Sequence, residues 1–292
     1  MTGGAVTALA PGPACDLVPC SRFGISALTE AYNQTRVDYL IPMPMNAERL
    51  REYIAVYDVD LDRSLVAVDG ERILGLGMLG RRSDRAWITR LGVLPTRRRR
   101  GVGETIVQAL LAEADAAGCR RVALEVIVRN DPAYALFVKC GFAAQRELVV
   151  LRRPPLPAAG APAAAPAEVR WLSPATAMRL LRQGGAPPPW TNAVETFEHA
   201  GDTIGLRVGL ADGGAGALVC RRQRYYLSHL VIHTEAGDPA TVGSALLGTL
   251  HAAFPDLDTH AENLVTTDPH LDAFRAAGYI ESFRRVEMVR MA

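Results

Sequence analysis

The first half of the chain alternates between segments with the two-residue period of strands and segments with the 3.6-residue period of helices. Strands are predicted over residues 16–21, 64–68, 73–81, 86–93, 122–128 and 142–151. Helices are predicted over residues 21–32, from residue 46, over residues 102–117 and over residues 131–140. A hairpin followed by alternating strands and helices is typical of an α/β fold with a mixed sheet.

Capping residues mark where three of the helices begin. Ser21 and Asn46 are the predicted N-caps of the first two helices. Asp131 is the predicted N-cap of the last helix of this half, with Pro132 at the first helical position. These positions predict the limits of the elements more sharply than periodicity alone.

The second half of the chain repeats the pattern of the first. Residues 130–142 are similar to residues 267–279 at an offset of 137, and the preceding helix recurs at an offset of 140. In the same comparison Glu125 coincides with Glu262. Apolar positions are kept in both copies, so the sequence predicts a tandem duplication of one fold.

A stretch rich in proline and alanine separates the two copies. Residues 154–167 contain no periodic apolar face, which is typical of a semi-rigid linker. We therefore expect a first domain over residues 1–153 and a second over residues 168–292. Each would have the size of a common domain.

Composition narrows the possible functions. The chain of 292 residues has a formal net charge of +1, which gives no general attraction for nucleic acid or for an anionic membrane. Its five cysteines show neither disulfide nor metal-ligand spacing, and no apolar run is long enough to cross a bilayer. We expect a cytoplasmic protein without a metal, a nucleic-acid partner or a membrane partner.

The segment between a predicted strand and a predicted helix carries the sharpest chemical signal. Residues 97–100 are four arginines, followed by Gly101 and Gly103. Backbone N–H groups of such a loop, the helix dipole and the arginines converge on an anion, and the glycines let a diphosphate approach closely. A solvated basic patch, a nucleic-acid contact and a sorting signal are the alternatives for the arginine run.

The second copy differs where this chemistry lies. Asp238 stands at the position of Arg98, and Thr241 stands at the position of Gly101. Core positions are kept while the loop is not. We therefore expect the second copy to have lost the ligand site of the first.

Two motifs resemble those of the GCN5-related N-acetyltransferase (GNAT) superfamily. Residues 98–103 match its R/Q-x-x-G-x-G/A loop, and residues 130–142 match its N-x-x-A-x-x-L-Y/F-x-K-x-G-F pattern. The resemblance implies two tandem GNAT-like domains, the second degenerate, and an N-acetyltransferase with acetyl-CoA as co-substrate. The implied acceptor is a small-molecule amine or a peptide amino group, which attacks the thioester directly in a ternary complex.

The resemblance also implies which residues hold the cofactor. Backbone groups of Leu91 and Val93 would bind the pantetheine arm, and the arginine loop with the start of its helix would bind the diphosphate. The complete implied set is Leu91, Val93, Arg98, Arg99, Arg100, Gly101, Val102, Gly103, Glu104, Thr105, Asn130, Tyr134, Phe137 and Lys139.

The groups that transfer protons are defined less sharply. Glu125 is the candidate base, and a purely structural strand position is the alternative, which the matching Glu262 favours. Phe137 stands where many family members have a tyrosine acid, and phenylalanine cannot donate a proton. Tyr134 is the candidate acid; another residue, a water molecule and no acid at all are the alternatives.

Two further questions stay open at the level of sequence. The apolar segment 39–45 is either a wall for the acceptor or part of the interface with the second domain. The missing tyrosine also permits a non-catalytic acyl-CoA sensor or scaffold as the alternative function. The sequence does not define an oligomeric state.

Overall fold

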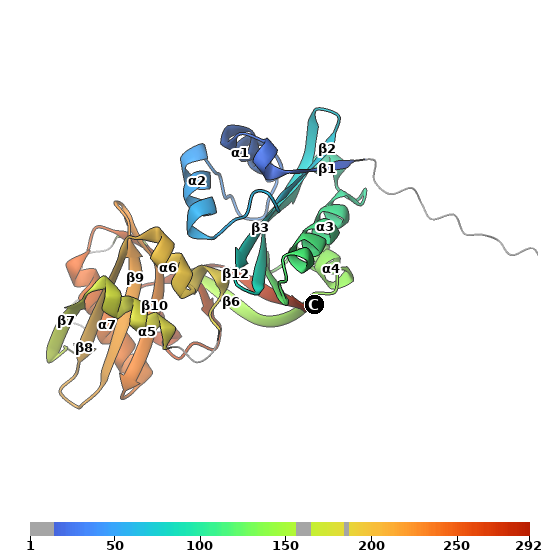
Figure 1. The fold of residues 1–292 in the computed structure, drawn as a ribbon. Helices are drawn as coiled ribbons and strands as arrows, with labels where there is room; N and C mark the ends of the chain where they lie inside the picture. Colours follow the sequence, from blue (N-terminus) through green and yellow to red (C-terminus); the bar gives the residue numbers. More distant parts are fainter. Residues whose placement is uncertain (1–14, 156–164, 184–186) are drawn as a thin grey trace, which may run out of the picture.

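The computed structural model describes residues 15–155, 165–183 and 187–292. One continuous sheet runs through the molecule (Figure 1). Its strands are β1 (Asp16–Pro19), β2 (Leu65–Asp69), β3 (Arg72–Arg82), β4 (Arg85–Val93), β5 (Arg121–Ile127), β6 (Ala143–Arg153), β7 (Glu168–Leu172), β8 (Thr203–Gly209), β9 (Ala215–Arg222), β10 (Tyr226–Ala236), β11 (Asp258–Val265) and β12 (Ile280–Met291). Their order is β1-β2-β3-β4-β5-β12-β6-β11-β10-β9-β8-β7. The mixed α/β fold is thus confirmed. Much of the predicted linker lies outside the described residues.

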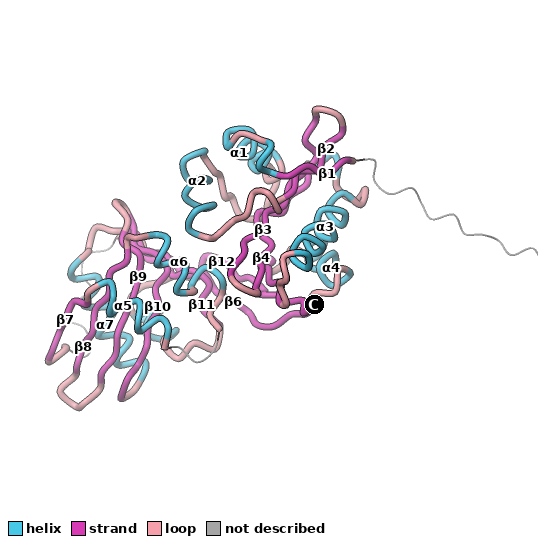
Figure 2. Tube along the Cα trace, in the orientation of Figure 1, coloured by secondary structure: helices cyan, strands magenta, loops and turns pink. Residues whose placement is uncertain are grey.

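Helices flank this sheet (Figure 2). They are α1 (Ile25–Gln34), α2 (Ala47–Val56), α3 (Val102–Ala116), α4 (Asp131–Lys139), α5 (Pro174–Arg182), α6 (Val194–Ala200), α7 (Pro239–Ala253) and α8 (Leu271–Ala276). Short 3-10 turns lie at η1 (Cys20–Arg22), η2 (Pro95–Arg97) and η3 (Trp190–Asn192). In the first half, α1 and α2 lie on one side of β3 and β4, and α3 and α4 lie on the other (Figure 1).

Each half of the chain gives one strand to the other half. β12 pairs antiparallel with β5, where Glu287 lies opposite Glu125. β6 pairs antiparallel with β11, where Leu151 lies opposite Ala261. Because β6 and β12 also pair with each other, the two halves share the centre of the sheet. The predicted limits 1–153 and 168–292 stay predictions, and strand pairing crosses between them.

Separate apolar clusters stabilise the two faces of the first half. The stripe predicted on α3, which includes Ile106 and Leu110, packs with Leu124 of β5. On the opposite face, Leu50 and Trp87 pack with Trp190 of the second half. The second half therefore completes a core that the first half does not fill alone.

The predicted N-cap of α2 is confirmed. The Oδ1 atom of Asn46 accepts a hydrogen bond from the backbone N–H of Arg49 at 2.8 Å. For α4 the prediction is displaced by one residue: the helix begins at Asp131, and the cap position is Asn130, whose side chain makes no capping hydrogen bond. That leaves the Asn130 side chain available to a ligand.

The predicted N-cap of α1 is wrong. Ser21 lies in η1, and α1 begins after Gly24. The physical reason is a pair of backbone hydrogen bonds: the N–H of Cys20 donates to Ser64 at 2.7 Å, and the N–H of Ser21 donates to Leu61 at 3.0 Å. These bonds hold the segment in a 3-10 turn before the helix can begin.

Candidate active site

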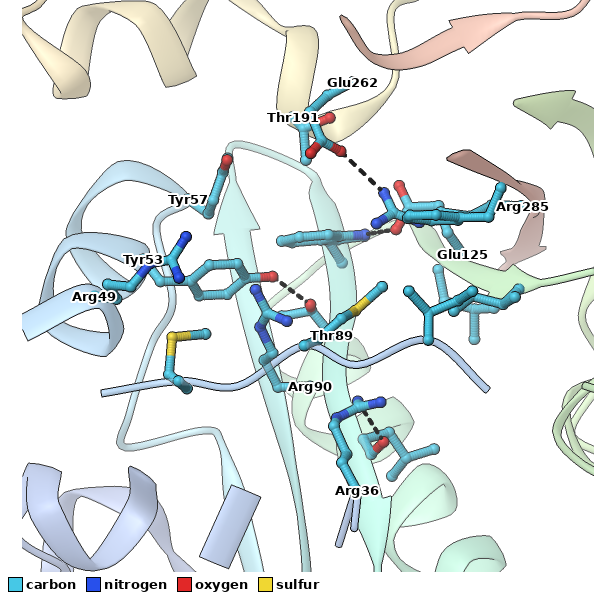
Figure 3. Close-up of a pocket in the computed structure, with 18 of the residues that line it drawn as sticks. Arg36, Arg49, Tyr53, Tyr57, Thr89, Arg90, Glu125, Thr191, Glu262 and Arg285 are labelled. Carbon is cyan, nitrogen blue, oxygen red and sulfur yellow. Dashed lines mark hydrogen bonds and ion pairs between the residues drawn. The ribbon is translucent and has the colours of Figure 1, made fainter. Parts of the chain in front are cut away.

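A cavity of about 590 Å³ lies where strands and loops of both halves meet (Figure 3). The first half contributes polar side chains from its α1–α2 region and from β4 and β5; the second contributes them from η3, β9, β10, β11 and β12. These polar residues include Arg36, Arg49, Tyr53, Thr89, Arg90, Glu125, Thr191, Arg221, His229, Glu262 and Arg285. The site is therefore not contained in either half alone.

The cavity opens where β4 separates from β5. The two strands pair in parallel only over Arg85–Trp87 opposite residues 121–123. Farther along, a register shift against β3 and a positive φ of 51° at Arg90 bend β4 away. Backbone groups of the last residues of β4 consequently face the opening rather than a neighbouring strand on that side.

The two predicted pantetheine contacts lie on this bent part of β4. The carbonyl of Leu91 accepts a hydrogen bond from Nη2 of Arg36 at 3.1 Å. The carbonyl of Val93 accepts one from Nε of Arg98 at 3.1 Å. Arginines thus hold the open edge of β4 in its bent conformation.

Glu125 lies at the base of the opening, on the face of β5 away from α3. Its Oε2 atom accepts a hydrogen bond from Nε1 of Trp87 at 2.7 Å. Its Oε1 atom is buried and has no partner among the described residues. Burial raises the pKa of Glu125 from 4.5 to about 7, although Arg285 and the bond from Trp87 lower it. Such a carboxyl group exchanges a proton at neutral pH, as a general base must.

The second half closes the site and contacts α2, where Arg221 forms an ion pair with Glu52 at 2.8 Å. Tyr57 Oη and His229 Nε2 lie 2.8 Å apart, and the ring of Trp190 stacks on Trp87 at 5.8 Å. Arg285 approaches Glu262 at 3.5 Å (Figure 3). Sequence reasoning missed these contributions, because residues far apart in the chain carry them. The only sequence signal was the coincidence of Glu262 with Glu125.

The glycine-flanked loop before α3 has the backbone geometry of an anion site. Gly101 is the N-cap of α3 with a φ of 84°, and Arg99 has a φ of 59°. In the described part of the chain, the N–H groups of Arg99 and Gly101 donate to no backbone acceptor. The first N–H groups of α3 have no partner within the helix, so this end can receive an anion.

The arginines of this loop differ in role. Arg98 forms a two-bond contact with Asp38 at 2.7 and 2.8 Å and also donates to the carbonyl of Thr35 at 2.9 Å. Arg98 therefore ties the loop to the end of α1. Arg99 and Arg100 form no ion pair among the described residues and stay available for a ligand.

Other predicted cofactor residues lie around α4. Asn130 and Phe137 line the cavity, and Phe137 is buried against Phe142. Lys139 forms an ion pair with Glu104 at 2.6 Å. Tyr134 lies on the outer side of α4, is 38% exposed and is not among the residues that line the cavity.

The segment 39–45 forms a wall of the cavity, to which Tyr39 and residues 41–45 contribute. Asn33 fixes one end of this wall. Its side chain donates to the carbonyl of Met45 at 2.9 Å and accepts from the N–H of Met45 at 3.0 Å. Of the two interpretations of this segment, the structure favours the wall.

Helix α7, the equivalent of α3 in the second half, carries the carboxylate of Asp238 at its N-terminus. Asp238 accepts hydrogen bonds from the N–H of Thr241 at 2.8 Å and from its hydroxyl at 2.6 Å. These bonds hold the pKa of Asp238 below its usual range. A fixed negative charge there repels a phosphate, which supports the expectation that the second copy lost its ligand site.

Within residues 15–155, 165–183 and 187–292, no helix has the length and apolar character needed to cross a membrane. No cluster of three or more histidine, cysteine or acidic side chains suited to a metal ion is found in the same part of the chain. All five cysteines are free thiols.

Residues 27–142 match the family described as the acetyltransferase (GNAT) family. The chain thus carries a GNAT-family domain in its first half. Among curated proteins, no sequence matches it.

Several solved structures share the whole architecture. A GCN5-related N-acetyltransferase from Sphaerobacter thermophilus is 14% identical, with a TM-score of 0.71 over 96% of this chain and 97% of that one. A tandem GNAT protein from the clavulanic acid biosynthesis pathway is 16% identical, with a TM-score of 0.65 over 95% and 98%. A putative acetyltransferase from Pyrococcus horikoshii is 13% identical, with a TM-score of 0.62 over 100% and 94%. These likenesses confirm the tandem GNAT-like fold.

Proposed function

We propose that the chain transfers an acetyl group from acetyl-CoA to an amine of a small molecule or peptide. The observation that carries the proposal is Glu125, a buried carboxyl group at the point where β4 and β5 separate, with a pKa of about 7 and one free oxygen. A thioester carbon reaching this opening lies beside a group that can deprotonate an incoming ammonium.

The chain offers a continuous path for the cofactor. The diphosphate binds at the N-terminus of α3, where residues 98–105 hold it. Arg99 and Arg100 supply positive charge to it. Arg98 positions the loop through its ion pair with Asp38. The pantetheine follows the open edge of β4 at Leu91 and Val93. Asn130 and Phe137 line the other side of this path. Tyr134 and Lys139 lie on the exposed side of α4, where they would contact the outer part of the cofactor.

The reaction proceeds in one ternary complex. Glu125 takes a proton from the ammonium, and the neutral amine attacks the thioester carbon. A carbon–nitrogen bond forms, the nitrogen loses its second proton to water, the carbon–sulfur bond breaks, and the thiolate leaves. The chain contributes orientation and a dry, preorganised opening, which together supply most of the rate.

The departing sulfur takes up one proton, for which Tyr134 is the proposed donor. Phe137 lines the cavity but has no hydroxyl. The variant Tyr134→Phe tests the assignment: a fall of about 10-fold or more in kcat supports it. An unchanged kcat would assign the proton to water.

A non-catalytic acyl-CoA sensor is the second candidate, and Phe137 is the observation that favours it. The decisive experiment measures thiol release from acetyl-CoA with and without a panel of amines. Release that depends on the amine, with the acetylated amine identified by mass, supports the enzyme. Tight binding of acetyl-CoA with no amine-dependent release would support the sensor. The free thiols of all five cysteines fit the reducing cytoplasm that we propose as its location.

A further inference from the structure

The cavity carries more positive than negative side chains. Its lining contains five arginines (Arg36, Arg49, Arg90, Arg221 and Arg285) and three glutamates (Glu52, Glu125 and Glu262). The pKa of about 7 for Glu125 lowers its average negative charge near neutral pH. A site for an amine alone has no need of this excess of positive charge.

The five arginines differ in whether the chain neutralises them. Arg221 pairs with Glu52 and Asp202, each at 2.8 Å. Arg285 approaches Glu262 at 3.5 Å. Arg36, Arg49 and Arg90 form no ion pair with any described residue.

Arg90 is the most constrained of these three. Its guanidinium lies 3.9 Å from the centre of the Tyr53 ring and 5.2 Å from that of Tyr32, and its Nη1 atom donates to the Tyr32 hydroxyl at 2.9 Å. Its Nε atom is buried and has no hydrogen-bond partner in the described part of the chain. A cation enclosed by aromatic rings with an unused donor is costly unless an anion joins it.

The diphosphate of the cofactor does not explain this arrangement. Tyr32 and Tyr53 belong to α1 and α2, so Arg90 projects to the face of the sheet that these helices cover. The anion site at Gly101 belongs to α3, on the other face. Arg90, which lies beside Tyr53 in Figure 3, therefore binds a group that approaches from the side of α1 and α2.

We propose that the acceptor amine also carries an oxyanion, a carboxylate or a phosphate, which binds Arg90 with help from Arg49 and Arg36. This inference rests on the proposed acetyl transfer and names the class of its acceptor. Arg36 lies over the same Tyr32 ring at 4.7 Å, so it shares this patch with Arg90. Arg49, an exposed residue of α2, lines the same cavity.

The path from Arg90 to Glu125 sets the shape of such an acceptor. Arg90 packs on Tyr53, the ring of Tyr53 lies 6.1 Å from that of Trp87, and Trp87 donates to Glu125. The anion and the amine thus sit at opposite ends of one aromatic pair. The acceptor is a compact molecule with its charged groups separated by an apolar part.

The test compares amines in matched pairs that differ only in the anion. Suitable pairs are 4-aminobutyrate and butylamine, and phosphoethanolamine and ethanolamine; the second pair separates phosphate from carboxylate. The wild type, Arg90→Gln and the control Arg121→Gln are compared by kcat/KM for thiol release. Arg121 lies on neighbouring β5 and outside the cavity.

We expect the anionic member to react about 10- to 100-fold better in the wild type and in Arg121→Gln, as a hydrogen bond to a charged group predicts. The preference disappears in Arg90→Gln. Neutral amines that react equally well, or a preference that survives in Arg90→Gln, would overturn the inference while acetyl transfer stands.

A panel with no turnover at all would count against the proposed function instead. Calorimetric titration of the same pairs into the CoA-loaded protein then decides the inference separately. Tighter binding of the anionic members to the wild type than to Arg90→Gln supports it. Equal binding, or no binding by any anionic member, overturns it.

Discussion

Glu125 and Glu262 illustrate how equivalent residues in a duplicated chain come to differ. Both line the same cavity. Glu125 keeps one oxygen free and buried, whereas Glu262 faces Arg285 at 3.5 Å. Burial raises the pKa of Glu125 to about 7, which suits a proton acceptor at neutral pH.

The variant Glu125→Gln tests this role through activity. We expect kcat/KM to fall by about 100- to 10,000-fold, because glutamine cannot accept the proton. In the wild type the rate should rise with pH through about 7, as the carboxyl group loses its proton. The control Glu71→Gln, at an exposed turn, should keep the wild-type profile. A wild-type rate without an inflection near this pH would argue for another base.

For the Glu125 carboxyl group, stability should change with pH in the direction opposite to activity. The pKa of Glu125 is raised on folding from 4.5 to about 7, so its contribution is fully present below pH 4.5 and is lost as the pH rises through 7. Relative to Glu125→Gln, the wild type should lose at most about 3 kcal/mol of unfolding free energy between these limits. Urea unfolding at pH 4 and pH 8 measures the difference. A constant difference at both pH values would contradict the assignment.

Among the elements, α3 and α7 are equivalent helices that differ in how their N-termini are capped. Gly101 leaves the first turn of α3 without a side-chain cap, whereas Asp238 caps α7. The N-terminus of α3 can therefore receive an anion, whereas the carboxylate of Asp238 occupies the N-terminus of α7. This contrast explains how a duplicated fold can keep its core and lose one binding site.

The variant Asp238→Ala tests whether the cap of α7 is purely structural. We expect it to lower the free energy of unfolding by about 1 kcal/mol and to leave the binding of acetyl-CoA unchanged. The control Asp272→Ala removes an exposed carboxylate, 81% accessible at its side chain, and should change stability by less than about 0.5 kcal/mol. A gain of a second acetyl-CoA site in Asp238→Ala would show that the carboxylate alone blocks it.

The sequence predicts most elements but not their assembly. The periodicity of residues 102–111 and 122–128 locates α3 and β5, and Asn46 marks the start of α2. Local signals of this kind depend on neighbours in the chain. The prediction for Ser21 failed because distant carbonyl groups bind that segment. The place of β12 beside β5 depends equally on contacts across more than 100 residues, which no local pattern encodes.

The candidate site shows the same division. The sequence alone predicts both motifs and Glu125, because the spacing of residues along one strand or helix determines which of them share a face. His229, Arg285 and η3 reach the cavity only through the folding of the second half. Arg90 points into the site because of a bend in β4 that carries no sequence signature.

For the whole molecule, the exchange of β6 and β12 joins the two halves into one sheet. Removing the second half leaves β5 without its partner β12 and exposes the core around Trp87 that Trp190 covers. We predict that residues 1–153 expressed alone form no stable monomer, because an unpaired central strand promotes association. Size-exclusion chromatography and thermal unfolding check this. A monomer with a cooperative transition would contradict it.

The central claim is that the chain binds acetyl-CoA at the N-terminus of α3 and not at that of α7, and calorimetric titration of acetyl-CoA tests it most directly. The variants are Gly101→Asp and the control Gly118→Asp, whose glycines have similar φ angles of 84° and 75°; Gly118 lies beyond the opposite end of α3. We predict one site per chain in the wild type and in Gly118→Asp, with binding lost in Gly101→Asp. Two sites, no binding to the wild type, or equal binding to Gly101→Asp would contradict the account.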